Sequence, residues 1–371
     1  METSNAHLIR AAQVVLPCGD LDATLAFFTE RLGFRVEAIF PADDPMVAVI
    51  AAHGVRLRLE RGAVGAPGVL RLLCSDPAAL AGGDTVLTAP NGTRVELAPA
   101  EAPIVLPPIQ QSFTLSRMTD DAQWKVGRAG MRYRDLIPDR QGGRFIASHI
   151  CIPGGGPVPD YVHFHKVRFQ MIYCRKGWAR LVYEDQGEPF VLAAGDCVLQ
   201  PPQIRHRVLE SSPGLEVIEI GCPAEHETHA DPGLALPTSA LRPDRDFGGQ
   251  RFVRHEAAKA IWQPWHLDGY ECRDSGIGAA TRGLAGARTV RPRVSAPPVM
   301  CSHDAEFLFW FVLDGGVTLQ AEGRGAERLA AGDSVVVPAG MRHALAEPSP
   351  ELELLEVTLP AEVEVAVEGG R

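Results

Sequence analysis

Three histidines and a glutamine in the middle of the chain have the types and spacing to bind a metal ion: His163, His165, His206 and Gln170. His163 and His165 stand two residues apart, so on a β-strand both side chains point to one face. Gln170 is expected to reach that face from the next strand, and His206 from a strand much later in the chain. Three neutral imidazoles and one amide oxygen suit a divalent first-row metal and leave coordination positions open for substrate, water or dioxygen. We therefore predict a catalytic metal centre, with packing histidines in a metal-free barrel as the alternative.

Other polar residues near these positions could assist the chemistry. His149 lies on the apolar segment before the histidine pair and could face the same cavity as a hydrogen-bonding or acid–base group. Arg168 could clamp a substrate carboxylate, but its odd spacing from the paired histidines places it on the opposite face of a regular strand, which favours a surface role. Tyr133, Arg134 and Arg273 belong to similar pieces in two parts of the chain, which favours a structural tie over chemistry.

The elements that would position these residues form an internal repeat. Segments within residues 131–225 match segments within residues 270–362 at an offset of about 138 residues. The matched pieces include Ala194-Gly195-Asp196 with Ala331-Gly332-Asp333, and Arg205-His206 with Arg342-His343. Each unit reads as short apolar strands separated by glycine-containing turns, which is typical of a sandwich or a small barrel.

The first unit of the repeat resembles the cupin superfamily. The residues that carry the resemblance are His163-Phe164-His165, Gln170, Gly177, Gly195-Asp196, Pro201-Pro202 and His206. The resemblance implies a mainly β protein with two double-stranded β-helix (jelly-roll) barrels in tandem, and a metal held by the three histidines and Gln170. The family usually has glutamate where this chain has Gln170. A neutral amide leaves the positive charge of the metal uncompensated, so a small-molecule substrate that is anionic should bind more readily.

In the second unit this ligand set is altered. Cys301 and Leu308 stand at two of the four ligand positions, whereas His303 and His343 keep the other two. One thiolate and two imidazoles could still hold zinc or copper at a second site, with Glu306 as a fourth donor. The alternative is a metal-free barrel in which Cys301 is a small buried residue. The very apolar segment around Leu308 favours that alternative and predicts an interior filled by side chains.

The N-terminal hundred residues read as a separate α+β unit. A strand over residues 12–16 is followed by an amphipathic helix that opens at Asp20 and closes at Gly33, and only strands follow. The segments 20–34 and 90–96 resemble the glyoxalase, or vicinal-oxygen-chelate (VOC), family of βαβββ modules. The resemblance implies a single module here, where the family usually pairs two.

That resemblance places metal ligands on the first and last strands of the module, at Gln13 and Glu96, and an intervening strand offers Glu60. Two carboxylates and an amide match a tight transition-metal centre poorly. A docking role, for example in a homodimer, is therefore favoured over a second active site.

Proline-rich stretches mark the boundaries between these units. The expected domains are a VOC-like domain over 8–98, a linker over 99–109, a first cupin domain with the metal site over 110–228, and a second cupin domain over 240–362.

Composition and charge restrict the kinds of partner that the protein can bind. A formal net charge of −10 without a Lys/Arg cluster, and without a helix-turn-helix pattern, argues against a nucleic-acid partner. No apolar run approaches the ~18 residues of a membrane span, and the first residues lack the layout of a secretion signal, so we place the protein in the cytoplasm. The eight cysteines form no Cys-x-x-Cys pair, which predicts reduced thiols.

Three histidines with a weak fourth ligand look like the iron(II) dioxygenases among the cupins, and this resemblance gives the leading hypothesis. It is a mononuclear dioxygenase in the first barrel that cleaves a small bidentate substrate, such as a diketone, an enol or a hydroxylated aromatic acid, with dioxygen. Iron(II) is the expected metal, and nickel, manganese, copper or zinc are alternatives. A redox-neutral isomerase or lyase, and a non-catalytic bicupin that binds a small molecule, are the alternative functions.

Overall fold

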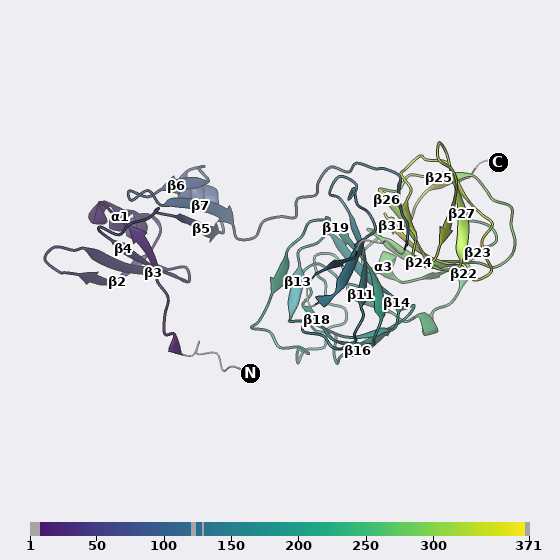
Figure 1. The fold of residues 1–371 in the computed structure, drawn as a ribbon, viewed down its shortest axis with the longest axis horizontal. Coiled ribbons are helices and arrows are strands. Elements are labelled where there is room, and N and C mark those ends of the chain that lie inside the picture. The colour runs from purple at the N-terminus through teal and green to yellow at the C-terminus, as the bar shows by residue number, and fades with distance from the viewer. Residues whose placement is uncertain (1–7, 120–123, 128–129, 368–371) are drawn as a thin grey trace. The chain divides into compact units, whose positions relative to one another are not determined.

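The computed structural model describes residues 8–119, 124–127 and 130–367 (Figure 1). The chain divides into two compact units, Met1–Pro103 and Ile104–Arg371. The boundary between them falls inside the proline-rich segment that the sequence marks as a linker. Strands dominate both units, which confirms the predicted fold class. Among the described residues, no helix has both the length and the apolar character needed to cross a membrane.

The N-terminal unit contains two modules of similar topology. The first comprises β1 (Val14–Pro17), α1 (Leu21–Ala26), the π-helical η2 (Phe27–Arg31), β2 (Arg35–Phe40), β3 (Val47–Ala52) and β4 (Val55–Glu60). The second comprises β5 (Val69–Cys74), α2 (Pro77–Ala81), β6 (Val86–Thr88) and β7 (Arg94–Pro99). Their sheets have the orders β1-β4-β3-β2 and β5-β7-β6, and in both the first strand pairs in parallel with the last.

The expectation of a single module is therefore wrong, because a second module that is one strand shorter follows the first. Its helix α2 is only five residues long, too short to show a helical period in the sequence. Its N-cap is Asp76, whose side chain accepts a hydrogen bond from the Ala79 amide, and a proline occupies its first turn. Both modules share one core, in which Phe28, Leu59 and Val95 are fully buried.

The C-terminal unit contains two barrels, each closed by a large and a small sheet (Figure 1). In the first barrel the large sheet has the order β21-β17-β14-β19-β11-β10-β9, and the small sheet has the order β16-β15-β18-β13-β20 with β12 beside β18. The bounds of these strands are β9 Lys125–Val126, β10 Arg132–Asp135, β11 Ile146–Ile152, β12 Gly156–Pro157, β13 His163–His165, β14 Phe169–Lys176, β15 Trp178–Tyr183, β16 Phe190–Ala193, β17 Cys197–Leu199, β18 His206–Ser211, β19 Leu215–Cys222, β20 Thr228–Ala230 and β21 Val253–His255.

The second barrel repeats this arrangement. Its sheets have the orders β22-β23-β24-β31-β26-β29-β8 and β28-β27-β30-β25-β32. The bounds of its elements are β8 Thr114–Ser116, β22 Gln263–Pro264, β23 Tyr270–Asp274, α3 Ile277–Ala280, β24 Gly286–Pro292, β25 Cys301–His303, β26 Phe307–Asp314, β27 Gly316–Ala321, β28 Gly325–Ala330, β29 Ser334–Val336, β30 His343–Ala346, β31 Glu353–Leu359 and β32 Val365–Val367; the 3₁₀ turn η4 spans Ala257–Lys259.

The two barrels exchange their outermost strands. β8 lies within the range expected for the first barrel, yet it pairs with β29 of the second. β21 lies within the range expected for the second barrel, yet it pairs with β17 of the first. Each exchanged strand is only three residues long, so its partner is decided by packing far away in the chain rather than by a local pattern. The sequence ranges 110–228 and 240–362 therefore do not separate the barrels.

The large sheets of the two barrels pack against each other through an aromatic core. On β26, Phe307, Phe309 and Phe311 point into this interface, whereas Leu308 and Trp310 point into the second barrel. The rings of Phe307 and Phe145 stack with centroids 4.1 Å apart. A strand that is buried on both faces reads as a continuous apolar run. The apolar segment around Leu308 therefore reflects the interface between the barrels as well as the barrel interior.

Candidate metal centre

His163, His165 and His206 converge at one end of the first barrel. His163 and His165 lie two residues apart on β13 and share one face of the strand. His206 begins β18 and lies directly opposite His163 in the antiparallel register. The potential ligand atoms of the three side chains all lie within 4.8 Å of one another, and the three residues are buried. Among the described residues this is the only group of three or more histidine, cysteine or acidic side chains that could hold an ion.

Hydrogen bonds orient the imidazole rings. The Nδ1 atoms of His163 and His206 lie 2.8 Å and 3.0 Å from backbone carbonyl oxygens two residues upstream. A carbonyl only accepts, so Nδ1 carries the proton and Nε2 of a neutral ring carries the lone pair that a metal needs. His165 Nδ1 lies 3.3 Å from the hydroxyl of Thr228 on β20. The carboxylate of Asp160, 3.6 Å from His163 Nδ1, adds a buried negative charge beside the cluster.

Gln170 lies at the wall of the same cavity and is held by a carboxylate. Its Nε2 donates to Glu219 Oε1 at 2.6 Å, and Gln170 is 1% exposed. Because the amide nitrogen is committed to Glu219, the amide oxygen is the atom that Gln170 can offer to a metal.

Sequence reasoning missed Glu219 as a site residue. A signal was present: Glu219 stands between two apolar residues of β19, and Glu356 occupies the same place in β31. The strand registers confirm the equivalence, since Glu219 pairs with Ile172 on β14 and Glu356 pairs with Trp310 on β26.

The cavity next to the cluster is small, about 90 Å³, and mostly apolar. Its lining residues are Met131, Tyr133, Ile150, Ile152, His163, His165, Gln170, Ile172, Ala179, Leu181, Tyr183, Leu192, Gln200, His206, Val208, Leu215, Val217 and Glu219. No lysine or arginine is among them. Tyr183 is fully buried, and its hydroxyl oxygen accepts a 2.8 Å hydrogen bond from Gln200 Nε2. Burial raises the pKa of this hydroxyl, so Tyr183 is uncharged. The described cavity wall therefore offers no fixed positive charge to a substrate.

His149 does not face this cavity, and the expectation that it would is wrong. On β11, Ile150 and Ile152 point into the barrel, so His149 points to the opposite face. There it donates to Glu216 Oε2 at 2.9 Å and lies against the ring of Phe311 from the second barrel. Burial lowers the pKa of His149, and its hydrogen bond lowers the pKa of Glu216 to about 2. The group belongs to the interface between the barrels.

The arginines considered from the sequence also tie the barrels together. Arg168 forms an ion pair at 3.0 Å with Glu306 of the second barrel, so it is neither a substrate clamp nor a simple surface residue. Arg134 donates to the carbonyl of Gly332, which confirms its structural role. Tyr133 differs from the expectation, because it lines the metal cavity.

Arg273 is a part-buried residue of the second barrel. Its guanidinium lies 4.5 Å from the ring centroid of Trp262. It also borders a small gap that Tyr173 and His255 of the first barrel line from the other side. This placement agrees with a structural role.

The second-site residues Cys301, His303 and His343 do not form a metal site. Both ring nitrogens of His303 are engaged by the backbone: Nδ1 accepts from the Ala305 amide at 3.1 Å, and Nε2 donates to the Val337 carbonyl at 3.1 Å. Burial raises the pKa of the Cys301 thiol to about 11. Among the described residues these three side chains are not a group whose ligand atoms all come together, so the structure gives no support to a second metal site.

Two other expectations about the second barrel are wrong. Glu306 is not a donor to its interior, because the carboxylate binds Arg144 and Arg168 of the first barrel. The interior is not filled by side chains, because it encloses a cavity of about 290 Å³. The prediction of a filled interior failed because half of the side chains in this apolar run point to the interface between the barrels and not into the barrel.

The glyoxalase-like unit does not gather its three expected ligands. Gln13 is exposed. Glu60 pairs with Arg58 at 2.7 Å, and Glu96 pairs with Arg94 at 3.1 Å. The two carboxylates stand on β4 and β7, which belong to different sheets, so this unit has no metal cluster among its described residues.

The comparisons with known proteins agree with this architecture. The cupin domain model matches residues 148–220 and again 289–358, and the model of the Glyoxalase/Bleomycin resistance protein/Dioxygenase superfamily matches residues 10–110. The chain is therefore a bicupin that carries an N-terminal domain of the glyoxalase superfamily, which confirms both resemblances. No curated protein matches the sequence.

Solved structures with the same fold are bicupins. A salicylate 1,2-dioxygenase from Pseudaminobacter salicylatoxidans superposes with a TM-score of 0.54 and 14% identity, covering 72% of this chain and 91% of that one. A mutant of the same enzyme in complex with gentisate gives 0.54 and 13%, covering 72% and 88%. A mutant of Bacillus subtilis oxalate decarboxylase gives 0.50 and 14%, covering 69% and 79%. At these identities the similarity establishes the fold alone.

Proposed function

We propose that the first cupin barrel is a mononuclear metal-dependent dioxygenase, with iron(II) as the metal, that acts on a small bidentate substrate. The observation that carries the proposal is the buried convergence of His163, His165 and His206 beside a mostly apolar cavity. Three imidazoles from two strands, with one amide oxygen nearby, form a donor set that suits a divalent first-row metal and leaves positions open.

Different residues of the barrel would bind the metal, orient its ligands and confine the substrate. The three Nε2 atoms would hold the metal, and Gln170 would add its amide oxygen in an orientation set by Glu219. When bound, such a metal polarises two adjacent substrate oxygens and, if it is iron(II), supplies the redox chemistry with dioxygen. The apolar wall excludes water and confines the substrate next to the cluster.

The cavity favours a diketone or enol over a hydroxylated aromatic acid. A substrate carboxylate that is not bound to the metal would need a cationic partner in the cavity wall, and the described lining contains none. Glu219 would further repel such a group. A volume of about 90 Å³ also restricts the substrate to a few carbon atoms. The enolate of a small 1,3-diketone fits, because its single charge lies on the two oxygens that face the metal.

Oxygen consumption tests the proposal directly. Protein purified without chelators is analysed for metal, loaded with iron(II) under anaerobic conditions, and mixed with 2,4-pentanedione, salicylate or gentisate in an oxygen electrode. We expect oxygen uptake with the diketone and little with the two aromatic acids. Uptake with the aromatic acids alone would contradict the substrate class, and bound zinc with no uptake for any of the three would contradict the dioxygenase.

One observation favours a redox-neutral isomerase or lyase as the second candidate. Glu219 places a carboxylate at the cavity wall, and a carboxylate is a common base for removing a proton next to a carbonyl group. In that case the protein would exchange the central hydrogens of the diketone for deuterium faster than deuterated water does without protein, and no oxygen would be consumed. The same substrate, followed by NMR and by the oxygen electrode, therefore separates the two candidates.

A further inference from the structure

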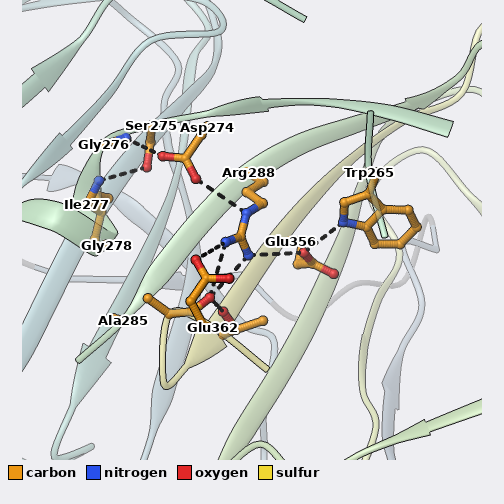
Figure 2. Close-up of polar contacts among 12 residues, drawn as sticks. Trp265, Asp274, Ser275, Gly276, Ile277, Gly278, Ala285, Arg288, Glu356 and Glu362 are labelled. Atoms are coloured by element: carbon orange, nitrogen blue, oxygen red, sulfur yellow. Dashed lines mark hydrogen bonds and ion pairs between the residues drawn. The ribbon is translucent and has the colours of Figure 1, made fainter. Parts of the chain in front are cut away.

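The second barrel encloses a cavity of about 290 Å³, larger than the metal cavity, and no function has been assigned to it above. Its centre is Glu356 on β31, which is 2% exposed. Two tryptophan side chains hold this carboxylate: Trp265 Nε1 donates to Oε1 at 3.2 Å, and Trp310 Nε1 donates to Oε2 at 3.0 Å. Figure 2 shows Glu356 between Trp265 and Arg288.

The single arginine of this cavity is already neutralised. Arg288 Nε lies 3.3 Å from Asp274, and its Nη atoms lie 3.1 Å from Glu362 and 3.8 Å from Glu356 (Figure 2). Both Nη atoms also donate to the carbonyl of Ala361 at 3.2 Å. Arg288 therefore has no strong donor left for an incoming anion.

The remaining titratable groups of the cavity add no positive charge at neutral pH. Burial lowers the pKa of His266 and of His303 to about 4 and also lowers the pKa of His343. The lining thus holds three carboxyl groups and one guanidinium, and it is net negative when Glu356 is ionised. The charge of Glu362 at the exposed rim is screened by solvent, whereas that of Glu356 lies inside the barrel. Burial raises the pKa of Glu356, which a cation beside it would reverse.

We propose that the second barrel is a metal-independent binding site for a small organic cation, an alkylammonium or alkylguanidinium. The charged head would donate to Glu356, and the alkyl body would lie against the rings of Trp265 and Trp310. An anion would meet the carboxylates, and a metal ion would find His303 engaged and Leu308 at a ligand position. The cavity volume accommodates a head group with a short alkyl chain.

The test uses the full-length, metal-loaded protein and isothermal titration calorimetry. The probes are n-butylammonium and n-butylguanidinium, with butyrate and n-butanol as matched anionic and neutral molecules. We expect saturable binding of the two cations, at least about tenfold weaker binding of n-butanol, and none of butyrate. Equal binding of butyrate, or no binding of either cation, would overturn the proposal. So would binding that requires added zinc or is lost with a chelator.

Two variants locate the site, and one matched variant controls for the first barrel. Glu356→Gln removes the charge and should weaken cation binding about tenfold or more. Val365→Trp fills the cavity from β32 without altering the charged groups and should abolish binding. Glu219→Gln, the equivalent change in the first barrel, should leave cation binding unchanged. Cation binding that survives both second-barrel variants, or that is lost in Glu219→Gln, would overturn the assignment.

Thermal unfolding separates binding loss from misfolding. If Glu356→Gln unfolds at a clearly lower temperature, its loss of cation binding is not counted. The binding measured for Val365→Trp then tests the location of the site, provided that this variant unfolds at the temperature of the parent protein. Oxygen uptake by the first barrel is independent of this site, so failure of the dioxygenase proposal leaves this one standing.

Discussion

The two barrels have the same strand order and the same glutamate on the long strand, but this glutamate has different neighbours. In the first barrel Glu219 accepts a hydrogen bond from Gln170 beside three converging histidines. In the second barrel leucine replaces that glutamine, and Glu356 accepts hydrogen bonds from two indoles instead. The fold keeps a carboxylate at one place, and the side chains around it decide which chemistry the cavity can perform.

The histidines of the two barrels show the same contrast. His163 and His206 turn Nδ1 to backbone carbonyls, which places the lone pair of each neutral ring on Nε2. His303, at a kept motif position, has both nitrogens bound to the backbone. A motif histidine can therefore become a structural residue without any change in its identity.

Replacing His163 should have the largest effect. His163→Ala removes one of three imidazoles, so we expect the bound metal and the oxygen uptake to fall to background. Cys301→Ala, at the equivalent position of the second barrel, should leave the metal content unchanged. The measurement is metal per chain by mass spectrometry. If His163→Ala retains a full equivalent of metal, the assignment of the centre to the first barrel is wrong.

The interface between the barrels should account for the next largest effect. Phe307→Ala leaves a void in a fully packed aromatic core and should reduce the free energy of unfolding by about 3–5 kcal/mol. Leu308→Ala, one residue further on, borders an existing cavity and should cost less. Denaturant unfolding measures both. Equal losses would contradict the placement of the two side chains on opposite faces of β26.

The orienting role of Glu219 predicts a smaller change. Glu219→Gln keeps the shape but loses the charge that holds the Gln170 amide, so metal affinity should fall about 10–100-fold. Competition with a chelator measures the affinity. Glu356→Gln serves as the control, because that carboxylate lies in the barrel without a metal cluster. An unchanged affinity in Glu219→Gln would remove Glu219 from the centre.

The smallest expected effect is a loss of stability in acid at the contact between the barrels. Burial lowers the pKa of His149 in the folded protein, so its contribution is lost as the pH falls below its ordinary value of 6.5. The pKa of Glu216 falls from 4.5 to about 2, so its contribution is lost between those values. The free energy of unfolding should drop between pH 7 and pH 5, and drop less in His149→Gln. Parallel curves would contradict this coupling.

Much of the site followed from short-range patterns in the sequence. The His163-x-His165 spacing fixes both rings on one face of a strand, whatever the rest of the chain does. The repeat then places His206 on a strand of the same barrel. Glu219 lies outside these motifs, and its contact with Gln170 joins residues 49 positions apart, so only the strand pairing brings the two side chains together.

What the sequence by itself determined is the internal repeat, the altered ligand set of its second unit, and the short motifs that resemble the cupin and glyoxalase families. The repeat follows from matches between two parts of the chain, and the resemblances rest on residue types at fixed spacings. The tertiary structure alone decided which face of β11 carries His149, which barrel receives β8 and β21, and whether the second barrel is hollow. These depend on how two sheets pack together, and a strand that is buried on both faces leaves no alternation in the sequence to show its inner side.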